Sequence, residues 1–150
     1  MSYEQKIKEM GYTIEPVELD TGKIIQAVKA GSLVFTSGQI SSWGGKAIKG
    51  KIGRDLTVEQ GYEAAKFCTL NNLRALKTLI GSLDDVVKFV KILGMVNIAP
   101  DFDDTPGVIN GCSDFLREVF GKAGYHSRSA VGMTVPLGWA VEVDMVVEVK

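Results

Sequence analysis

The segment 141–149 alternates strictly between apolar and polar positions for most of its length, and this pattern constrains the fold more than any other. Valine or methionine occupies every odd position, while Glu142, Asp144 and Glu148 lie between them. A period of two is the signature of a β-strand with one face on a hydrophobic core and the other face polar. The rest of the chain must therefore supply a layer that covers one face of a sheet.

Two amphipathic helices are predicted to supply that layer. The first begins at Thr57–Gln60, which fits a capping box in which the Thr hydroxyl and the Gln amide satisfy free backbone donors. Its apolar residues recur at helical spacing as far as Gly81, a typical helix end. The second begins at Thr105–Pro106, where Pro at the first helical position costs no hydrogen bond, and it ends at Gly121. Both helices have one apolar face.

Four further β-rich runs accompany the C-terminal strand. They are Ile24–Val28 and Leu33–Ser37, which read as a hairpin, then Val86–Leu93 and Ala130–Val135. The resulting order is β-β-α-β-α-β-β. This order predicts an α+β fold in which both helices cover one face of a mixed, mostly antiparallel sheet. The other face keeps apolar residues, so we expect self-association to hide it.

The chain is expected to form a single domain, residues 1–150, of which residues 1–22 are an N-terminal extension. Glu4–Met10 fits a short amphipathic helix, and a further short strand is an option at Tyr12–Ile14. The first ten residues are polar and charged, which does not fit a secretory signal.

Charge and composition narrow the class of function. The net charge is −1, which gives no electrostatic attraction for nucleic acid, so a nucleic-acid partner is not expected. No apolar run approaches the ~20 residues of a membrane span. The chain has 2 cysteines and 1 histidine, too few for a disulfide framework or a zinc site. We therefore expect a cytoplasmic protein without a metal site.

Two motifs have simpler explanations than catalysis. Gly45–Ile52 resembles a phosphate-binding P-loop, but Ile52 stands where the magnesium-binding hydroxyl belongs and no helix is predicted to follow, so a flexible basic loop is favoured. Cys68 and Cys112 lie on or beside the apolar faces of their helices, which favours buried, inert thiols.

Arg128 is the most informative single residue. A guanidinium on a strand packed on both faces must either reach solvent or bind a partner, and its fork of donors suits a planar carboxylate. Two explanations stay open from the residues alone. Arg128 could pair with Glu142 or Asp144 across a hairpin around Pro136–Trp139, or it could bind the acid group of a small ligand.

Several motifs, in this order, together resemble one family, the YjgF-like or Rid (reactive intermediate deaminase) proteins, also called L-PSP proteins. The resemblance covers the chain from Ile24 to its C-terminus. Three shorter motifs resemble a subgroup with an added N-terminal helix. The family motifs are Phe35–Ile40, Gly81–Lys88, Val108–Asn110, Arg128–Val131, Pro136 and Val141–Val143, and the subgroup motifs are Arg54–Leu56, Asn110–Asp114 and His126–Arg128.

The resemblance implies a chorismate-mutase-like fold and a homotrimer with ligand clefts between subunits. It also implies hydrolysis of 2-imino or 2-enamino acids to 2-keto acids and ammonia, without a cofactor. By position, Arg128 would bind the substrate carboxylate, and Glu142 would position water or relay protons. Backbone groups of Gly38 and Ala130 would contribute, with Ser37 and Asn110 at the cleft.

One position departs from the family pattern. The family often has a cleft-lining Tyr before the first strand, where this chain has Ile24. Loss of the phenol removes a hydrogen-bonding group and changes the pocket. A trimer that binds a small carboxylate without turnover, such as a metabolite sensor, is therefore the alternative to a deaminase. An RNase or translation inhibitor is a third option, which the near-neutral charge disfavours.

Overall fold

The computed structural model describes residues 1–150. Its principal elements follow the predicted order, with a short helix before them and three two-residue strands between β2 and α2. The helices are α1 (Tyr3–Glu9), α2 (Val58–Ile80) and α3 (Thr105–Phe120), and the 3-10 turns are η1 (Leu83–Asp85), η2 (Gly121–Gly124) and η3 (Pro136–Gly138). The strands are β1 (Ala27–Ala30), β2 (Leu33–Thr36), β3 (Gln39–Ile40), β4 (Ser42–Trp43), β5 (Lys46–Ala47), β6 (Val86–Asn97), β7 (Ser127–Met133) and β8 (Val141–Val149).

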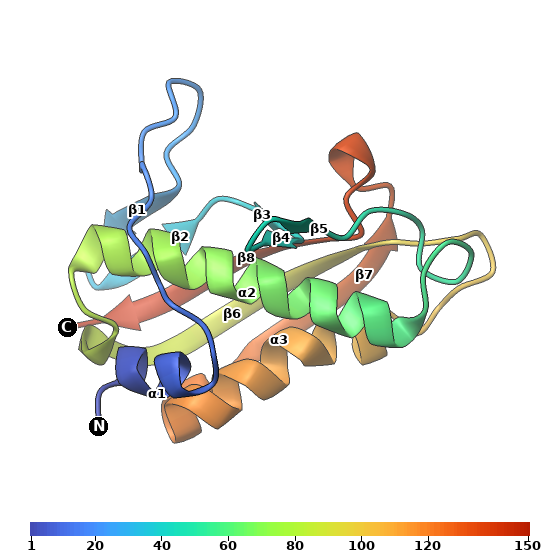
Figure 1. Cartoon of the computed structure of the whole chain (residues 1–150). Helices are drawn as coiled ribbons and strands as arrows, with labels where there is room; N and C mark the ends of the chain where they lie inside the picture. The colour runs from blue at the N-terminus through green and yellow to red at the C-terminus, as the bar shows by residue number, and fades with distance from the viewer.

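The main sheet has the strand order β1-β2-β8-β6-β7, and β3 also pairs with β8. The β6–β7 pair is parallel and the other pairs are antiparallel. Helices α2 and α3 lie side by side on the same face of this sheet (Figure 1). The predicted fold class, two helices on one face of a mixed and mostly antiparallel sheet, is therefore confirmed.

Strand β8 is the centre of the sheet and carries the alternation seen in the sequence. Its odd positions, from Val141 to Val149, are buried against the helices, and its even positions are only half-buried. The side chains at the odd positions belong to the hydrophobic core that both helices share. The period-two pattern thus distinguishes the helix-covered face from the open face along the whole strand.

The predicted helix ends are also confirmed. The Thr57 hydroxyl accepts from the Gln60 backbone N–H at 3.2 Å, and the Gln60 side chain accepts from the Thr57 N–H at 2.8 Å. Gly81 and Gly121 cap the C-termini of α2 and α3 with φ angles of 91° and 58°, which glycine adopts without a steric penalty. Local sequence therefore sets the length of both helices.

Small residues let α3 approach its neighbours closely. A Cβ on Gly111 would lie 2.0 Å from the backbone oxygen of Tyr62 in α2, and one on Gly94 of β6 would lie 2.5 Å from Ile109. The backbones of α2 and α3 are therefore in close contact at Gly111, and the side chain of Ile109 in α3 packs directly on β6 at Gly94. This packing brings the exposed edge of α3 beside strand β7.

Three strand predictions need correction. β1 runs over Ala27–Ala30 and not Ile24–Val28, because the Ile24 carbonyl accepts from the backbone and hydroxyl of Thr21 in a turn. β7 begins earlier than predicted and pairs with β6 from Ser127 onward. β6 also extends beyond Leu93, to Asn97, because β7 and β8 both pair with it there.

The N-terminal segment packs on the helical layer. Ile7 of α1 is fully buried, and the ring of Tyr3 lies 4.5 Å from that of Phe120. The chain then runs along α2, where the Lys77 ammonium donates to the Ile14 carbonyl at 3.1 Å. No strand forms at Tyr12–Ile14. Side chains of α2 bind this backbone in place of a neighbouring strand.

The face of the sheet opposite the helices is not covered within the protomer. Val28 pairs with Phe35 and Phe35 with Val146, so these residues share this open face. Four apolar side chains on it are strongly exposed: Val28 49%, Phe35 46%, Val131 40% and Met133 39%. No helix of the chain is both long and apolar enough to cross a membrane.

The segment Gly45–Ile52 forms no phosphate-binding loop. It contains strand β5, which pairs with β4 through a turn at Gly44 and Gly45. Ile52 is fully buried and forms isolated bridges, and α2 begins only at Val58. The segment therefore lacks the helix N-terminus on which a P-loop places its phosphate.

Candidate functional site

Arg128 lies on the edge strand β7, and side chains of helix α3 accept hydrogen bonds from its guanidinium. It pairs with Ile92 of β6, whose side chain is buried under the helices, so Arg128 lies on the helix side of the sheet. Its Nη1 donates to Asn110 Oδ1 at 2.9 Å and to Ser113 Oγ at 3.2 Å. Asn110 and Ser113 are one helical turn apart and therefore point the same way. Both partners are neutral, and Arg128 forms no ion pair.

The hypothesis that Arg128 pairs with Glu142 or Asp144 across a hairpin is wrong. Strands β7 and β8 do not pair, because β6 lies between them and runs parallel to β7. The turn around η3 therefore connects two strands that are not neighbours. The sequence left two explanations for Arg128 open. This geometry excludes pairing with Glu142 or Asp144 and leaves the binding of a ligand's acid group.

A histidine and a serine extend the group around Arg128. His126 Nδ1 lies 2.7 Å from the Gly124 carbonyl, which can only accept, so Nδ1 carries the ring proton. The Ser113 hydroxyl therefore donates to Nε2 of His126 at 2.9 Å and accepts from Arg128. Burial lowers the pKa of His126, and the nearby charges of Arg117 and Arg128 lower it further. The neutral ring is thus the favoured form.

These side chains line a small polar cavity of about 250 Å³. Sequence reasoning identified Asn110 and Arg128 in it but missed Ser113 and His126. The spacing could have indicated Ser113, because a residue three positions after Asn110 shares its helix face. The lining residues are Asn110, Ser113, Asp114, Arg117, His126 and Arg128.

Glu142 and Gly38 form a second group on the open face. A Cβ at Gly38 would lie 2.6 Å from Glu142 Oε2, so only glycine leaves room for this carboxylate over the backbone. Glu142 lies between β3 and β6, paired with Ile40 and Met95. Burial raises the pKa of Glu142, and the neighbouring charge of Asp144 raises it further. Glu142 therefore holds a proton more readily than an exposed glutamate.

Three other predicted residues complete the two groups. The Ser37 hydroxyl donates to the Ile25 carbonyl at 2.6 Å, which ties the segment containing Ile24 to the Gly38 region. Ile24 itself is 52% exposed. Ala130 lies on β7 near Arg128, and its carbonyl accepts from the Thr105 hydroxyl at 2.9 Å. One of the backbone groups predicted for the ligand thus already has a protein partner.

The predicted residues are therefore in two places within one protomer. Arg128 aligns across β6 with Met145, three residues beyond Glu142 on β8. Strand spacings place the two Cα atoms roughly 14 Å apart. In addition, Glu142 points to the open face and Arg128 to the helix side. A ligand the size of an amino acid cannot contact both side chains of the same protomer.

Neither thiol belongs to either group of site residues. Cys68 and Cys112 are free and fully buried. Burial raises the pKa of Cys112 to about 12 and that of Cys68 well above its usual value. Reactive thiols need a lowered pKa and access, so these cysteines serve the core. No cluster of three or more His, Cys, Asp or Glu side chains could hold a metal ion.

Comparison with known proteins identifies the family. Residues 4–148 match the family model described as "YjgF/chorismate_mutase-like, putative endoribonuclease". The chain belongs to the YjgF-like family. Within that family it is 34% identical over 147 residues to protein TCP17 of Trypanosoma cruzi, which covers 96% of this chain and 92% of TCP17.

Two solved structures show how this YjgF-like chain relates to the family. A protein of Shewanella oneidensis, described as "a putative endoribonuclease", is 30% identical with a TM-score of 0.92, covering 99% of this chain and all of the other. E. coli TdcF, solved with bound serine, is 25% identical with a TM-score of 0.59, covering 91% and 94% of the two chains. The fold of this YjgF-like protein is thus closer to the first structure than to TdcF.

Proposed function

We propose that this protein hydrolyses reactive 2-imino and 2-enamino acids to 2-keto acids and ammonia. The observation that carries the proposal is the guanidinium of Arg128, which two neutral side chains hold in place and no carboxylate neutralises. A fixed, uncompensated guanidinium is suited to bind a carboxylate through two parallel hydrogen bonds. The serine bound by the relative TdcF carries such a carboxylate, which supports an amino-acid-like ligand.

Hydrolysis of an imine requires little beyond placement of the reactants. The imine carbon is electrophilic, so water adds to it, the nitrogen gains protons, and ammonia leaves as the carbonyl forms. Arg128 would fix the carboxylate end of the substrate. Glu142 would accept a proton from the attacking water and return it to the leaving nitrogen. Its raised pKa suits this transfer at neutral pH, and positioning alone can contribute several kcal/mol.

The two groups of side chains would meet between copies of the chain. Because Arg128 and Glu142 cannot share a ligand within one protomer, an active cleft needs Glu142 of one copy and Arg128 of another. The open sheet face offers an interface, since Phe35 and Val28 are exposed there. Burial of such a patch favours association. A homotrimer with clefts between subunits, as the family resemblance implies, satisfies both requirements.

A binding protein without turnover is the second candidate. Its support is Ile24, which offers no hydroxyl at the position where the family often has a cleft-lining Tyr. Such a trimer would bind a small carboxylate, for example a 2-keto acid, and act as a metabolite sensor.

One assay separates the candidates. The purified protein is added to an amino-acid dehydratase that releases an enamine, and 2-keto acid formation is followed above the spontaneous rate. Acceleration proportional to protein concentration supports the deaminase. Saturable binding of a 2-keto acid without acceleration supports the sensor and rules out the deaminase for this substrate class. A parallel incubation with RNA tests the endoribonuclease named for relatives of the chain.

A further inference from the structure

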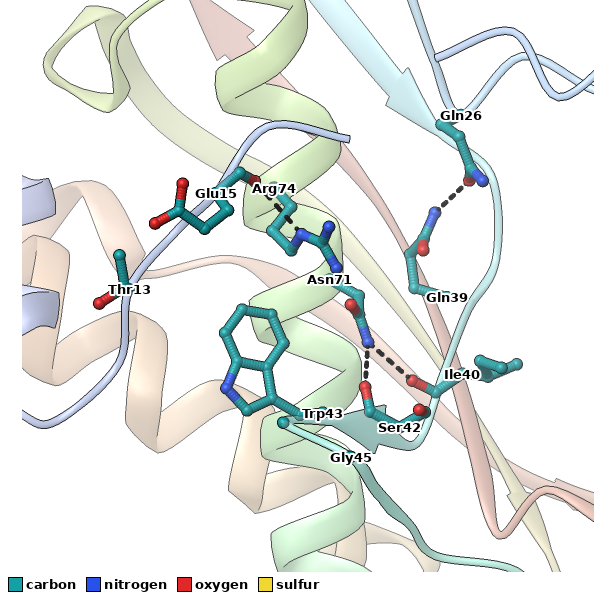
Figure 2. Close-up of a pocket in the computed structure, with 11 residues that line it drawn as sticks. Thr13, Glu15, Gln26, Gln39, Ile40, Ser42, Trp43, Gly45, Asn71 and Arg74 are labelled. Atoms are coloured by element: carbon teal, nitrogen blue, oxygen red, sulfur yellow. Dashed lines mark hydrogen bonds between the residues drawn. The ribbon is translucent and has the colours of Figure 1, made fainter. Parts of the chain in front are cut away.

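A second cavity lies on the helix side of the sheet; it shares no residue with the cavity around Arg128, and its lining residue Gln39 directly follows Gly38. It has a volume of about 720 Å³ and opens between the N-terminal segment, helix α2 and strands β3 and β4 (Figure 2). Gln39 pairs with Val143, a buried residue of β8, so its side chain lies on the helix side of the sheet. The cavity and Glu142 are therefore on opposite faces, and the volume is in the range of small-molecule sites.

Side chains of α2 hold both walls of this cavity in place. Asn71 Nδ2 donates to the carbonyls of Ser42 at 2.7 Å and Ile40 at 3.2 Å. One turn later, Arg74 Nε donates to the Glu15 carbonyl at 3.2 Å. The β3–β4 wall and the N-terminal wall are thus tied to the same helix. A cavity fixed in this way loses little conformational entropy when a ligand binds.

One end of the cavity combines an aromatic ring with a positive charge. The half-buried indole of Trp43 lies there, and the Arg74 guanidinium carbon is 5.7 Å from its ring centroid (Figure 2). Arg74 forms no ion pair, and its polar contacts are only with backbone carbonyls. An aromatic ring can stack on the indole, and an anionic group can accept from the guanidinium donors that have no protein partner.

The other end presents a paired donor and acceptor. Gln39 Nε2 donates to Gln26 Oε1 at 2.7 Å and more weakly to the Ser37 carbonyl at 3.3 Å (Figure 2). This pairing leaves Gln39 Oε1 as an acceptor and Gln26 Nε2 as a donor, with no protein partner for either. Two amides with such an unused edge complement the donor and acceptor groups of a heteroaromatic ring.

We propose that this cavity is a second ligand site, which takes a planar heteroaromatic ring that carries a carboxylate or a phosphate. The ring stacks on Trp43, the anionic group binds Arg74, and the Gln26–Gln39 pair binds the polar edge of a ligand long enough to reach it. The site does not depend on Arg128 or Glu142, so it stands whether or not the protein is a deaminase. The ligand can be an aromatic acid or a nucleotide, since both have this chemistry.

The test measures binding of four compounds by calorimetry. Nicotinate and adenosine 5′-monophosphate each combine a ring with an anion, whereas nicotinamide lacks the charge and inorganic phosphate lacks the ring. We expect at least one of the first two to bind with a Kd of about 1 mM or tighter, and about tenfold more tightly than its control. Binding of nicotinate alone identifies an aromatic acid, and binding of the nucleotide identifies a phosphate-bearing ligand.

Variants link this binding to the cavity. Arg74→Gln and Trp43→Leu should each weaken it about tenfold, while Arg74→Lys, which keeps the charge, should retain part of the affinity. Arg128→Ala should leave it unchanged, which separates this cavity from the proposed deaminase site. Melting curves identify variants that fail to fold, and the folded Arg74 variants then decide the result.

Three results would overturn the proposal. The first is that neither ring-bearing anion binds. The second is that inorganic phosphate binds as tightly as the nucleotide, which would indicate a simple charge effect. The third is that affinity survives in folded Arg74→Gln and Trp43→Leu but is lost in Arg128→Ala.

Discussion

At the scale of single residues, the two proposed catalytic side chains have different supports and therefore different expected variants. Arg128 is held by hydrogen bonds from its own guanidinium to Asn110 and Ser113. The carboxylate of Glu142 lies over the backbone of Gly38, and it can take this position because Gly38 has no side chain. Replacing Arg128 removes a charge that binds, whereas replacing Glu142 removes a group that moves a proton.

Arg128→Ala should weaken binding of a 2-keto acid by about 10- to 100-fold, because hydrogen bonds to a charged group contribute about 1.5–3 kcal/mol. Turnover should fall with it. Arg128→Lys should recover little, since an ammonium cannot reproduce the planar fork. Calorimetric titration and the coupled imine assay measure the two effects. Arg54→Ala, at an exposed arginine paired with Asp55, is the matched control. Wild-type affinity and rate in Arg128→Ala would refute the proposed role.

Glu142→Gln should slow hydrolysis by about 10²-fold or more while leaving 2-keto acid binding nearly intact, because only proton transfer is lost. The kinetics report kcat separately from KM, and a titration reports affinity. Glu148→Gln changes a half-buried carboxylate on the same side of β8 and should leave both unchanged. Equal losses in Glu142→Gln and Glu148→Gln would point to a general effect on the strand.

His126 should make stability fall on acidification. Its folded pKa lies below the unfolded value of 6.5, mainly because of burial, so the unfolded chain binds the proton first as pH decreases. The contribution of His126 to the free energy of unfolding is fully present above about pH 7, and it is lost as the pH falls from 6.5 through the pKa of the folded state. Melting curves across this range, compared with His126→Asn, isolate the effect. The raised pKa values of Glu142 and Asp144 act in the opposite direction and are common to both proteins.

A pH dependence of the melting temperature that is the same in His126→Asn as in the wild type would contradict this assignment. It would mean that burial and the nearby charges of Arg117 and Arg128 do not hold the ring neutral in the folded protein.

At the scale of elements, the position of α3 decides where the Arg128 group forms. Helix α3 crosses α2 at Gly111 and covers β6 at Gly94, so Asn110 and Ser113 reach the edge strand β7. Neither glycine needs an unusual backbone angle. Both are required because another element occupies the space of their missing side chain.

Gly111→Ala should destabilise the fold strongly, because the new methyl group would meet the Tyr62 backbone oxygen at 2.0 Å and force the helices apart. Overpacking of this kind costs about 3 kcal/mol, or a melting temperature roughly 6–12 °C lower for a chain of this size. Thermal denaturation measures the change. Glu118→Ala, at an exposed position of the same helix, should alter stability by about 0.5 kcal/mol at most. Equal melting temperatures in the two variants would mean that α3 can move away at no cost.

At the scale of the whole molecule, the open sheet face and the divided site have a common explanation. The exposed apolar residues on that face have no cover within the protomer, and the proposed catalytic pair has no shared cleft within it. One assembly that covers the face while joining Arg128 of one copy to Glu142 of another would satisfy both.

We expect a homotrimer in solution at micromolar concentration, with a mass about three times 16.2 kDa. Phe35→Glu places a charge in the proposed interface and should shift the mass toward the monomer and abolish turnover together, since a buried unpaired charge is costly. Lys8→Glu, on the exposed side of α1, is the control and should stay trimeric. Light scattering coupled to gel filtration measures the mass. A stable monomer for the unmodified protein would remove the interfacial cleft from the mechanism.

Local patterns in the sequence determined the elements and the layer they form. The alternation along β8, the capping box at Thr57 and the glycines at the helix ends each act within a few residues, so each could be recognised from adjacent positions. Arg128 could likewise be singled out, because its chemistry does not depend on its neighbours. These features predicted two helices on one face of a sheet with a guanidinium on one of its strands.

Only the tertiary structure decided how the elements combine. The place of β6 between β7 and β8 separates Arg128 from Glu142, and the packing of α3 supplies Ser113 as a partner of Arg128. The cavity beside Trp43 depends on the N-terminal segment, whose backbone carbonyl at Glu15 accepts from the side chain of Arg74 in α2. Such contacts join residues far apart in the chain, and strand pairing and helix packing are selected by burial of the whole core. A pattern within a few adjacent residues therefore cannot predict which strands pair or how the helices pack.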